Sequence, residues 1–139
     1  MCDSVKELCE EADIVSLHTR ASKKTNNLMG TKELQALASH SGFIVNISRA
    51  TILDYQTVSK LIEEKKLGGA ALDVWPEEPI ISDWLFKLAK NPLVIATPHI
   101  AGKQRYALER AVATCAYNVA WVLGDSPHNA YVVPWKELE

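Results

Sequence analysis

The sequence predicts an α/β fold, in which a half-sheet of about four parallel strands carries flanking helices and precedes one long C-terminal helix. Short apolar segments alternate with helical patterns, and the four segments are 14–18, 43–48, 70–74 and 93–97. Parallel strands need a crossover between them, which a helix usually supplies. Most of these segments lack a clean apolar and polar alternation, which predicts strands covered by helices on both faces.

The first two helices are predicted from their caps. Within residues 3–13, Ser4 and Glu7 form an S-x-x-E capping box, and apolar residues follow at helical spacing. Thr31 can cap a second helix over residues 32–40.

Two further helices follow the same rules. Asp54 can cap a helix over residues 55–67, and the glycine pair at 68–69 ends it. From residue 103 to about 123, apolar residues recur at helical spacing until Gly124. We expect this long helix to close the chain.

The composition argues against several classes of protein. A net charge of -2 with interspersed signs forms no basic patch, so we expect no nucleic acid partner. No apolar run approaches the roughly 20 residues of a membrane span, so we expect no membrane partner. The three cysteines, Cys2, Cys9 and Cys115, lack metal-ligand or C-x-x-C spacing. This usage predicts no metal site and a cytoplasmic location.

The chain lacks one part of a nucleotide-binding sheet. Such a sheet opens with a strand, a G-x-G-x-x-G turn and a helix whose N-terminus holds a pyrophosphate. None of the six glycines is spaced in that way, and the sequence opens directly in a helix. The pattern is typical of the second half of such a sheet.

Polar residues gather where the predicted strands end. Ligands of open α/β sheets bind outside the carboxyl ends of the strands, so this clustering indicates a site. The strand-end groups are His18-Thr19, Asn46 to Arg49, Asp73, and Thr97 to His99. Structural roles stay open for several of them: His18 can contact backbone, Ser48 and Thr97 can satisfy local backbone groups, and Asp73 can cap a loop.

Arg49 and His99 are the best candidates for chemistry. A guanidinium at a strand end can bind a carboxylate through two hydrogen bonds, or it can form a structural salt bridge with a loop acid. His99 follows Pro98, which restricts the backbone, and a carboxylate from Glu77 or Glu78 could orient its ring for general acid/base work. The alternative is an exposed loop histidine.

Four ordered segments then resemble a known family. They are LHTRASKKTNNLMG, IVNISRATILD, GGAALDVWPEEP and TPHIAG. In order and approximate spacing they are similar to the signature segments of D-isomer-specific 2-hydroxyacid dehydrogenases, the phosphoglycerate dehydrogenase-like group. The resemblance runs from about Ser4 to Pro134. It implies that residues 1–102 are the C-terminal half of a Rossmann-like NAD-binding domain, and that 103–139 form a closing helix and tail returning to the substrate domain.

The resemblance also implies roles for individual residues. Arg49 would bind the carboxylate and carbonyl of the acid, and His99 would be the general acid/base. Glu78 is the implied partner of His99, with Glu77 the looser match. NAD is the implied cofactor, and the implied cofactor-binding residues are Thr19, Ile47, Ser48, Arg49, Asp73, His99 and Gly102.

The sequence departs from the family at several positions. Ala50 replaces a glycine, Arg20 a proline, and Gln104 and Tyr106 the usual threonine and glutamate. The glycine turn and the ribose-binding acid are also missing, so the sequence leaves the choice between NAD and NADP open.

The implied function is NAD-dependent oxidoreduction of the CH–OH group of a D-2-hydroxy acid. We expect this chain to be a truncated C-terminal part that is inactive alone. The alternative is a non-catalytic, cofactor-sensing or scaffolding module of the same ancestry. The expected partners are a small 2-hydroxy or 2-oxo acid and further copies of the chain, because an exposed sheet edge and an uncovered cofactor face favour a homo-oligomer.

Overall fold

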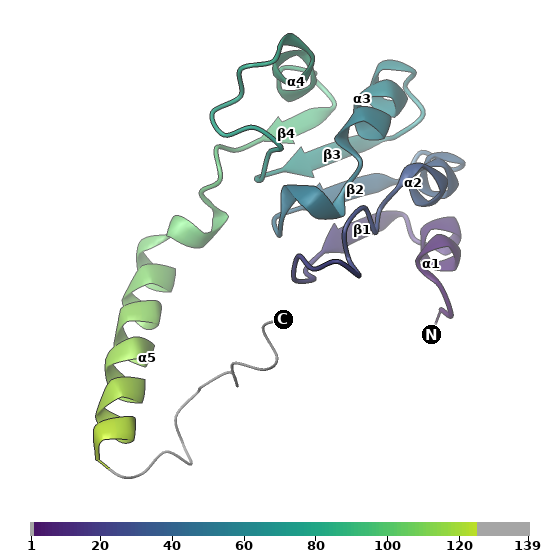
Figure 1. Ribbon diagram of the computed structural model, residues 1–139. Helices are drawn as coiled ribbons and strands as arrows, with labels where there is room; N and C mark the ends of the chain where they lie inside the picture. Colours follow the sequence, from purple (N-terminus) through teal and green to yellow (C-terminus); the bar gives the residue numbers. More distant parts are fainter. Residues whose placement is uncertain (1, 125–139) are drawn as a thin grey trace. The chain divides into compact units, whose positions relative to one another are not determined.

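The structure is a computed structural model that describes residues 2–124. The chain divides into two compact units, Met1–His99 and Ile100–Glu139. The elements of the first unit, in chain order, are α1 (Val5–Glu11), β1 (Ile14–Leu17), α2 (Thr31–Ala38), β2 (Phe43–Asn46), the 3-10 turn η1 (Ala50–Ile52), α3 (Tyr55–Glu63), β3 (Gly69–Leu72), α4 (Asp83–Ala89) and β4 (Val94–Ala96). Those of the second are the 3-10 turn η2 (Ala101–Lys103) and α5 (Arg105–Leu123), as Figure 1 shows.

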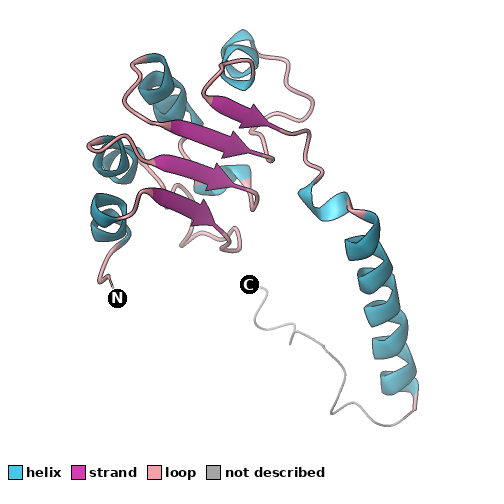
Figure 2. Cartoon of the chain, turned by 180° about the vertical axis from the view of Figure 1, so that it is seen from behind, coloured by secondary structure: helices cyan, strands magenta, loops and turns pink. Residues whose placement is uncertain are grey.

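The four strands form one parallel sheet in the order β1-β2-β3-β4. Their arrows point the same way in Figure 2. Each strand pair is joined by one helix, so the crossovers predicted for parallel strands are present. The predicted fold class is confirmed. As a consequence, the carboxyl ends of all four strands lie at one edge of the sheet.

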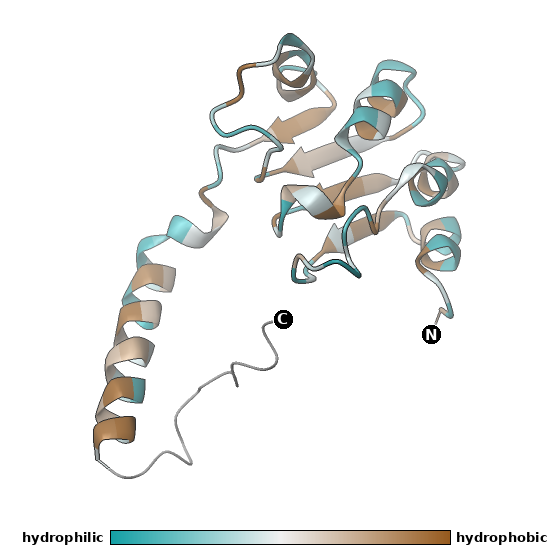
Figure 3. Ribbon diagram, in the orientation of Figure 1, coloured by the Kyte–Doolittle hydropathy of each residue, from teal (hydrophilic) through white to brown (hydrophobic). Residues whose placement is uncertain are grey.

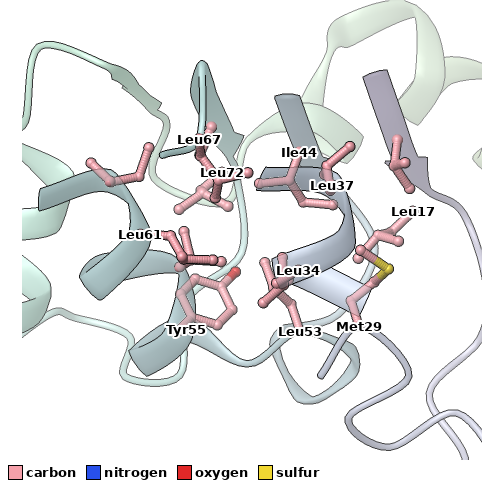
Figure 4. Packing of buried hydrophobic residues seen from close by; sticks show 14 of the residues in the cluster. Leu17, Met29, Leu34, Leu37, Ile44, Leu53, Tyr55, Leu61, Leu67 and Leu72 are labelled. Carbon is pink, nitrogen blue, oxygen red and sulfur yellow. The ribbon is translucent and has the colours of Figure 1, made fainter. Parts of the chain in front are cut away.

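The core lies between the sheet and the helices α1 to α4. Fully buried side chains from the helices, such as Leu34, Val58 and Leu85, pack against Ile44 and Leu72 of the sheet. Figure 4 shows part of this cluster. Burial of this kind is the main force that holds such a domain together.

The opposite face of the sheet is not covered by the helices of the first unit. Ile14 is 63% exposed, Phe43 46% and Ile95 71%, and Figure 3 shows apolar colour along the strands. Within the first unit, the helices therefore cover one face of the sheet rather than the two faces that the sequence predicted. Right-handed crossovers between strands in sequential order put all the connecting helices on one side.

Two of the three predicted N-caps are confirmed. The side chains of Ser4 and Asp54 each accept a hydrogen bond of 3.1 Å from the backbone N–H three residues on. Thr31 is not the cap of α2, because Gly30 occupies that position. The Thr31 hydroxyl instead donates to Asp54 Oδ2 over 3.2 Å and so ties the start of α2 to the start of α3.

The third helix ends earlier than predicted, at Glu63. Lys65 has a φ of 54°, and this left-handed residue breaks the helix before the glycine pair is reached. The two glycines serve close packing instead: a Cβ on Gly68 would lie 2.3 Å from the carbonyl oxygen of Ser41. Gly69 already belongs to β3.

Helix α4 was not predicted. Its seven residues follow the proline-rich loop, and its apolar side chains Leu85 and Leu88 are buried in the core. The helix supplies the crossover between β3 and β4.

In the second unit, the long helix begins at Arg105 rather than Lys103, because Ala101–Lys103 form a separate 3-10 turn. Its 19 residues are exposed or half-buried. Within residues 2–124, no helix combines the length and apolar character needed to cross a membrane.

Candidate active site

Two of the cavities at the carboxyl edge of the sheet include Arg49 in their lining. The first is lined by the residues that follow β1 and β2, namely Leu17, His18, Thr19, Arg20, Ala21, Ile47, Ser48 and Arg49. The second has a volume of about 910 Å³, and its wall includes Arg49, Tyr55, Trp75, Glu78, Trp84 and His99. Arg49 lines both cavities, so it stands between them. The second cavity brings together the three side chains predicted to be catalytic.

The side chains of His99 and Glu78 are in hydrogen-bonding contact at this edge. The Nδ1 atom of His99 lies 2.8 Å from Glu78 Oε2 and 3.0 Å from Oε1. The backbone N–H of Trp75 donates to Glu78 Oε1 over 3.0 Å, which holds the carboxylate in place. Since Nδ1 faces the carboxylate, Nε2 is the ring atom that can exchange a proton with a ligand.

The backbone at His99 is held in an uncommon conformation. Its φ is 52°, in the left-handed region that non-glycine residues rarely adopt. The His99 N–H donates to the Asp73 carbonyl oxygen over 2.8 Å, which anchors this turn to the end of β3. The turn thereby fixes where the imidazole ring projects.

Glu77 is not the partner of His99. Its Oε2 accepts hydrogen bonds from the backbone N–H groups of Ile81, over 3.3 Å, and Ser82, over 3.0 Å, just before α4. The Ser82 hydrogen bond is the main cause that holds the pKa of Glu77 below its usual value. Of the two adjacent acids, the structure therefore places Glu78 at the histidine and Glu77 at the start of a helix.

Arg49 sits on a turn that Asn46 braces. Asn46 is fully buried; its Nδ2 donates to the Arg49 carbonyl oxygen over 3.1 Å, and its Oδ1 accepts from the Ser48 N–H over 3.1 Å. The guanidinium donates to the Ser48 carbonyl oxygen over 2.7 Å and is exposed. None of the ion pairs found among residues 2–124 joins Arg49 to a loop acid. The side chain is thus placed to meet a ligand.

The residues predicted to hold the cofactor fall in two places. Thr19, Ile47 and Ser48 line the first cavity, and the Ser48 hydroxyl donates to the Thr19 carbonyl oxygen. Asp73 is 3% exposed at the end of β3 and accepts a hydrogen bond from the Thr97 hydroxyl. Gly102 belongs to η2 in the second unit. The cofactor roles of these residues stay predictions.

The first cavity suits an anionic dinucleotide. Its eight lining residues include two arginines and a histidine but no carboxylate. It also lies outside the carboxyl ends of parallel strands, where nucleotides bind in open α/β sheets. The hydroxyl groups of Thr19 and Ser48 and the cation of Arg49 would be the groups to hold NAD. Among the described residues, no cluster of three or more His, Cys, Asp or Glu side chains could hold a metal ion.

Tyr55 and Trp75 also belong to this site, although neither was predicted from the sequence. Tyr55 is 3% exposed and Trp75 6%, and both line the second cavity. The Tyr55 hydroxyl and the Trp75 indole N–H each need a hydrogen-bond partner when they are buried. This need is the signal in the sequence that could have pointed to them.

A parallel sheet with a histidine–carboxylate contact and an arginine-lined cavity at its carboxyl edge is an arrangement that dinucleotide-dependent oxidoreductases use. Residues 1–101 match the family model of the D-isomer specific 2-hydroxyacid dehydrogenase, NAD binding domain. The chain therefore belongs to this family, as its sequence motifs predicted.

Curated relatives agree with the family match. The chain is 37% identical over 123 residues to a glyoxylate reductase of Thermococcus litoralis, covering 88% of the chain and 36% of that protein. It is 36% identical over 111 residues to a D-3-phosphoglycerate dehydrogenase of Dictyostelium discoideum, covering 78% of the chain and 27% of that protein. The chain thus spans only about a third of the length of these relatives.

Solved structures share the fold. The NAD-complexed D-isomer specific 2-hydroxyacid dehydrogenase of Lactobacillus delbrueckii ssp. bulgaricus superposes with a TM-score of 0.80 at 27% identity, over 94% of this chain and 43% of that one. D-lactate dehydrogenase with NAD+ from Lactobacillus jensenii gives a TM-score of 0.78 at 25% identity, over 91% and 41%.

Proposed function

We propose that this chain is part of an NAD-dependent dehydrogenase that interconverts a D-2-hydroxy acid and its 2-oxo acid. The observation that carries the proposal is the 2.8 Å contact between His99 Nδ1 and Glu78 Oε2, in a cavity that Arg49 also lines. A scaffolding module has no physical need for such a pair.

Each of the three side chains has a distinct part in the reaction. Bound NAD supplies the hydride acceptor or donor. Arg49 binds the carboxylate of the acid through its planar guanidinium and orients the carbon–oxygen bond that reacts. In the oxidation direction, His99 Nε2 accepts the hydroxyl proton, and in the reduction direction the imidazolium returns it to the carbonyl oxygen. Glu78 keeps the ring oriented and stabilises the imidazolium.

On the cofactor side, Thr19, Ile47, Ser48 and Asp73 would line the NAD site together with Arg49 and His99. The first cavity and the position of Asp73 at the end of β3 support this. Gly102 is the remaining residue of the proposed cofactor set, on the family resemblance alone.

The proposal is tested by NADH oxidation with pyruvate, hydroxypyruvate or glyoxylate. We expect turnover from the complete protein that contains this sequence. We propose that the 139-residue chain alone has none, because none of its six glycines forms a pyrophosphate-binding turn. If the complete protein failed to oxidise NADH with every one of these 2-oxo acids, the proposed function would be contradicted.

Replacing Glu78 with glutamine tests the acid/base pair. The amide keeps the shape of the side chain but cannot stabilise the imidazolium, so we expect kcat/KM of the complete protein to fall at least about 10-fold. Glu77→Gln is the matched control, since Glu77 meets the start of α4 rather than His99. Equal steady-state kinetics for the two variants would show that Glu78 has no special part.

We also propose that the protein forms homo-oligomers in the cytoplasm. Apolar side chains exposed on the sheet face and on α5, such as Ile14, Ile95 and Val112, favour self-association. Burial raises the pKa of the Cys9 thiol to about 11, which suits an inert thiol of a reducing compartment. Sedimentation equilibrium is expected to give a mass above that of the monomer. A single monomeric species at every concentration would contradict oligomer formation.

A further inference from the structure

A hydrogen-bonded network through the buried residues Asn46 and Tyr55 connects the turn that carries Arg49 with the loop that carries Glu78. It starts at the turn that carries Arg49, whose carbonyl oxygen accepts from Asn46 Nδ2 over 3.1 Å. The same amide nitrogen donates to the Tyr55 hydroxyl oxygen over 3.3 Å, and the Tyr55 hydroxyl donates to the carbonyl oxygen of Val74. Strand β2 and the loop after β3 are thereby joined through the first residue of α3.

Every polar side-chain group of Asn46 and Tyr55 in this network has a partner. The two N–H groups of Asn46 donate to Arg49 and Tyr55, and its oxygen accepts from the Ser48 N–H. These partners fix the orientation of the amide, since only its nitrogen can donate to a carbonyl. Burial is the main cause that raises the pKa of Tyr55, so the hydroxyl stays protonated and can always donate.

At its other end, the network reaches the Glu78 and His99 pair through Trp75. The Tyr55 and Trp75 rings pack at a tilt of 50°, with their centroids 6.0 Å apart. The Trp75 backbone N–H donates to Glu78, and its indole Nε1 donates to the Thr97 carbonyl oxygen over 2.9 Å. Figure 4 shows the Tyr55 ring among the buried hydrophobic side chains of the core.

We propose that Tyr55 is a positioning residue that couples the Arg49 turn to the Glu78 and His99 pair. This inference rests on the proposed function. Because its hydroxyl is engaged by Asn46 and Val74, Tyr55 acts on the site through those groups. A buried network whose members are all satisfied is rigid, and rigidity at this place sets the distance between the substrate-binding cation and the proton carrier.

The first test is kinetic. Tyr55→Phe in the complete protein keeps the ring and removes the hydroxyl, leaving an Asn46 N–H and the Val74 carbonyl without their partner. We expect kcat to fall about 10-fold well below the melting temperature, with KM for NADH changed less than about twofold, because misplaced groups slow the chemical step. Two controls accompany it: Tyr117→Phe, which removes an exposed hydroxyl, and Ile62→Val, which loosens the core side of α3.

The second test needs no activity. In the 139-residue chain, Tyr55→Phe is expected to speed hydrogen exchange at the N–H groups of both Ser48 and Trp75 by about 10-fold, while Phe43 in β2 is unchanged. Ile62→Val should not speed these two sites selectively. Unchanged exchange at either site overturns the coupling.

The outcomes separate the inference from the function on which it rests. The positioning role alone is overturned if Tyr55→Phe has normal kcat while His99→Ala is inactive. It is also overturned if the loss of kcat in Tyr55→Phe is no larger than that in Ile62→Val. Normal turnover in His99→Ala would overturn the proposed function itself.

Discussion

Replacing His99 with alanine is expected to lower kcat/KM of the complete protein by about 10²- to 10⁴-fold, the usual worth of a general acid/base. The imidazole contacts the Glu78 carboxylate at 2.8 Å and lines the cavity that Arg49 also lines. NAD affinity should change far less, because the ring serves the reacting oxygen. Steady-state kinetics and equilibrium binding of NAD check the two halves of this prediction.

His40→Ala is the matched control for His99→Ala. His40 is an exposed histidine of the first unit whose Nε2 lies 3.0 Å from the Ala12 carbonyl oxygen. Both residues precede strands, so His40 is away from the carboxyl ends of the strands, where the candidate site lies. We expect its kinetics to match the wild type. If His99→Ala also turned over like the wild type, His99 would not be the proton carrier.

Arg49→Lys is expected to lower kcat/KM for the 2-oxo acid roughly 100-fold, and mainly through KM. The lysine keeps the positive charge but loses the planar pair of donors that binds and orients a carboxylate. Arg49→Ala should therefore be little worse than Arg49→Lys. Steady-state kinetics with saturating NADH measures both variants.

Arg105→Lys provides the comparison for this substitution. Its side chain is 93% exposed and pairs with Glu109 on the surface of α5, so the same change should have little effect. Full activity of Arg49→Lys would show that a single charge is enough, and the two-pronged contact would then be wrong.

The fold was predictable because its signals are local. Apolar segments, the caps at Ser4 and Asp54, and the need for crossovers between parallel strands together imply one sheet with its carboxyl ends at one edge. The position of Arg49 and His99 at that edge follows directly. Family resemblance then supplied their expected roles, which the sequence alone left open.

The remaining features depend on contacts between distant residues. Spacing cannot distinguish the roles of Glu77 and Glu78, because neighbours in a loop differ only in the groups that they contact. Here Glu77 accepts a hydrogen bond from the Ser82 N–H, and Glu78 contacts His99. The contact between Tyr55 and Trp75 joins residues 20 apart, and no local pattern reports it.

Two features of the fold differ from those predicted, and each difference has a physical cause. Helix α4 follows a loop rich in proline and acid, and its seven residues are too short to show clear periodicity. The exposed sheet face was missed because short strands such as 70–72 carry apolar residues on both sides, whether or not a helix covers them.

The most direct test of the account is the stereochemistry of the reaction in the complete protein. NADH formation from NAD should be measured with the D and L enantiomers of the same 2-hydroxy acid, in the wild type and in His99→Ala. We predict turnover of the D enantiomer only, and its loss in the variant, because Arg49 and His99 together fix one face of the substrate toward the cofactor. Preference for the L enantiomer, or equal turnover of D acid by the wild type and the variant, would contradict the assignment.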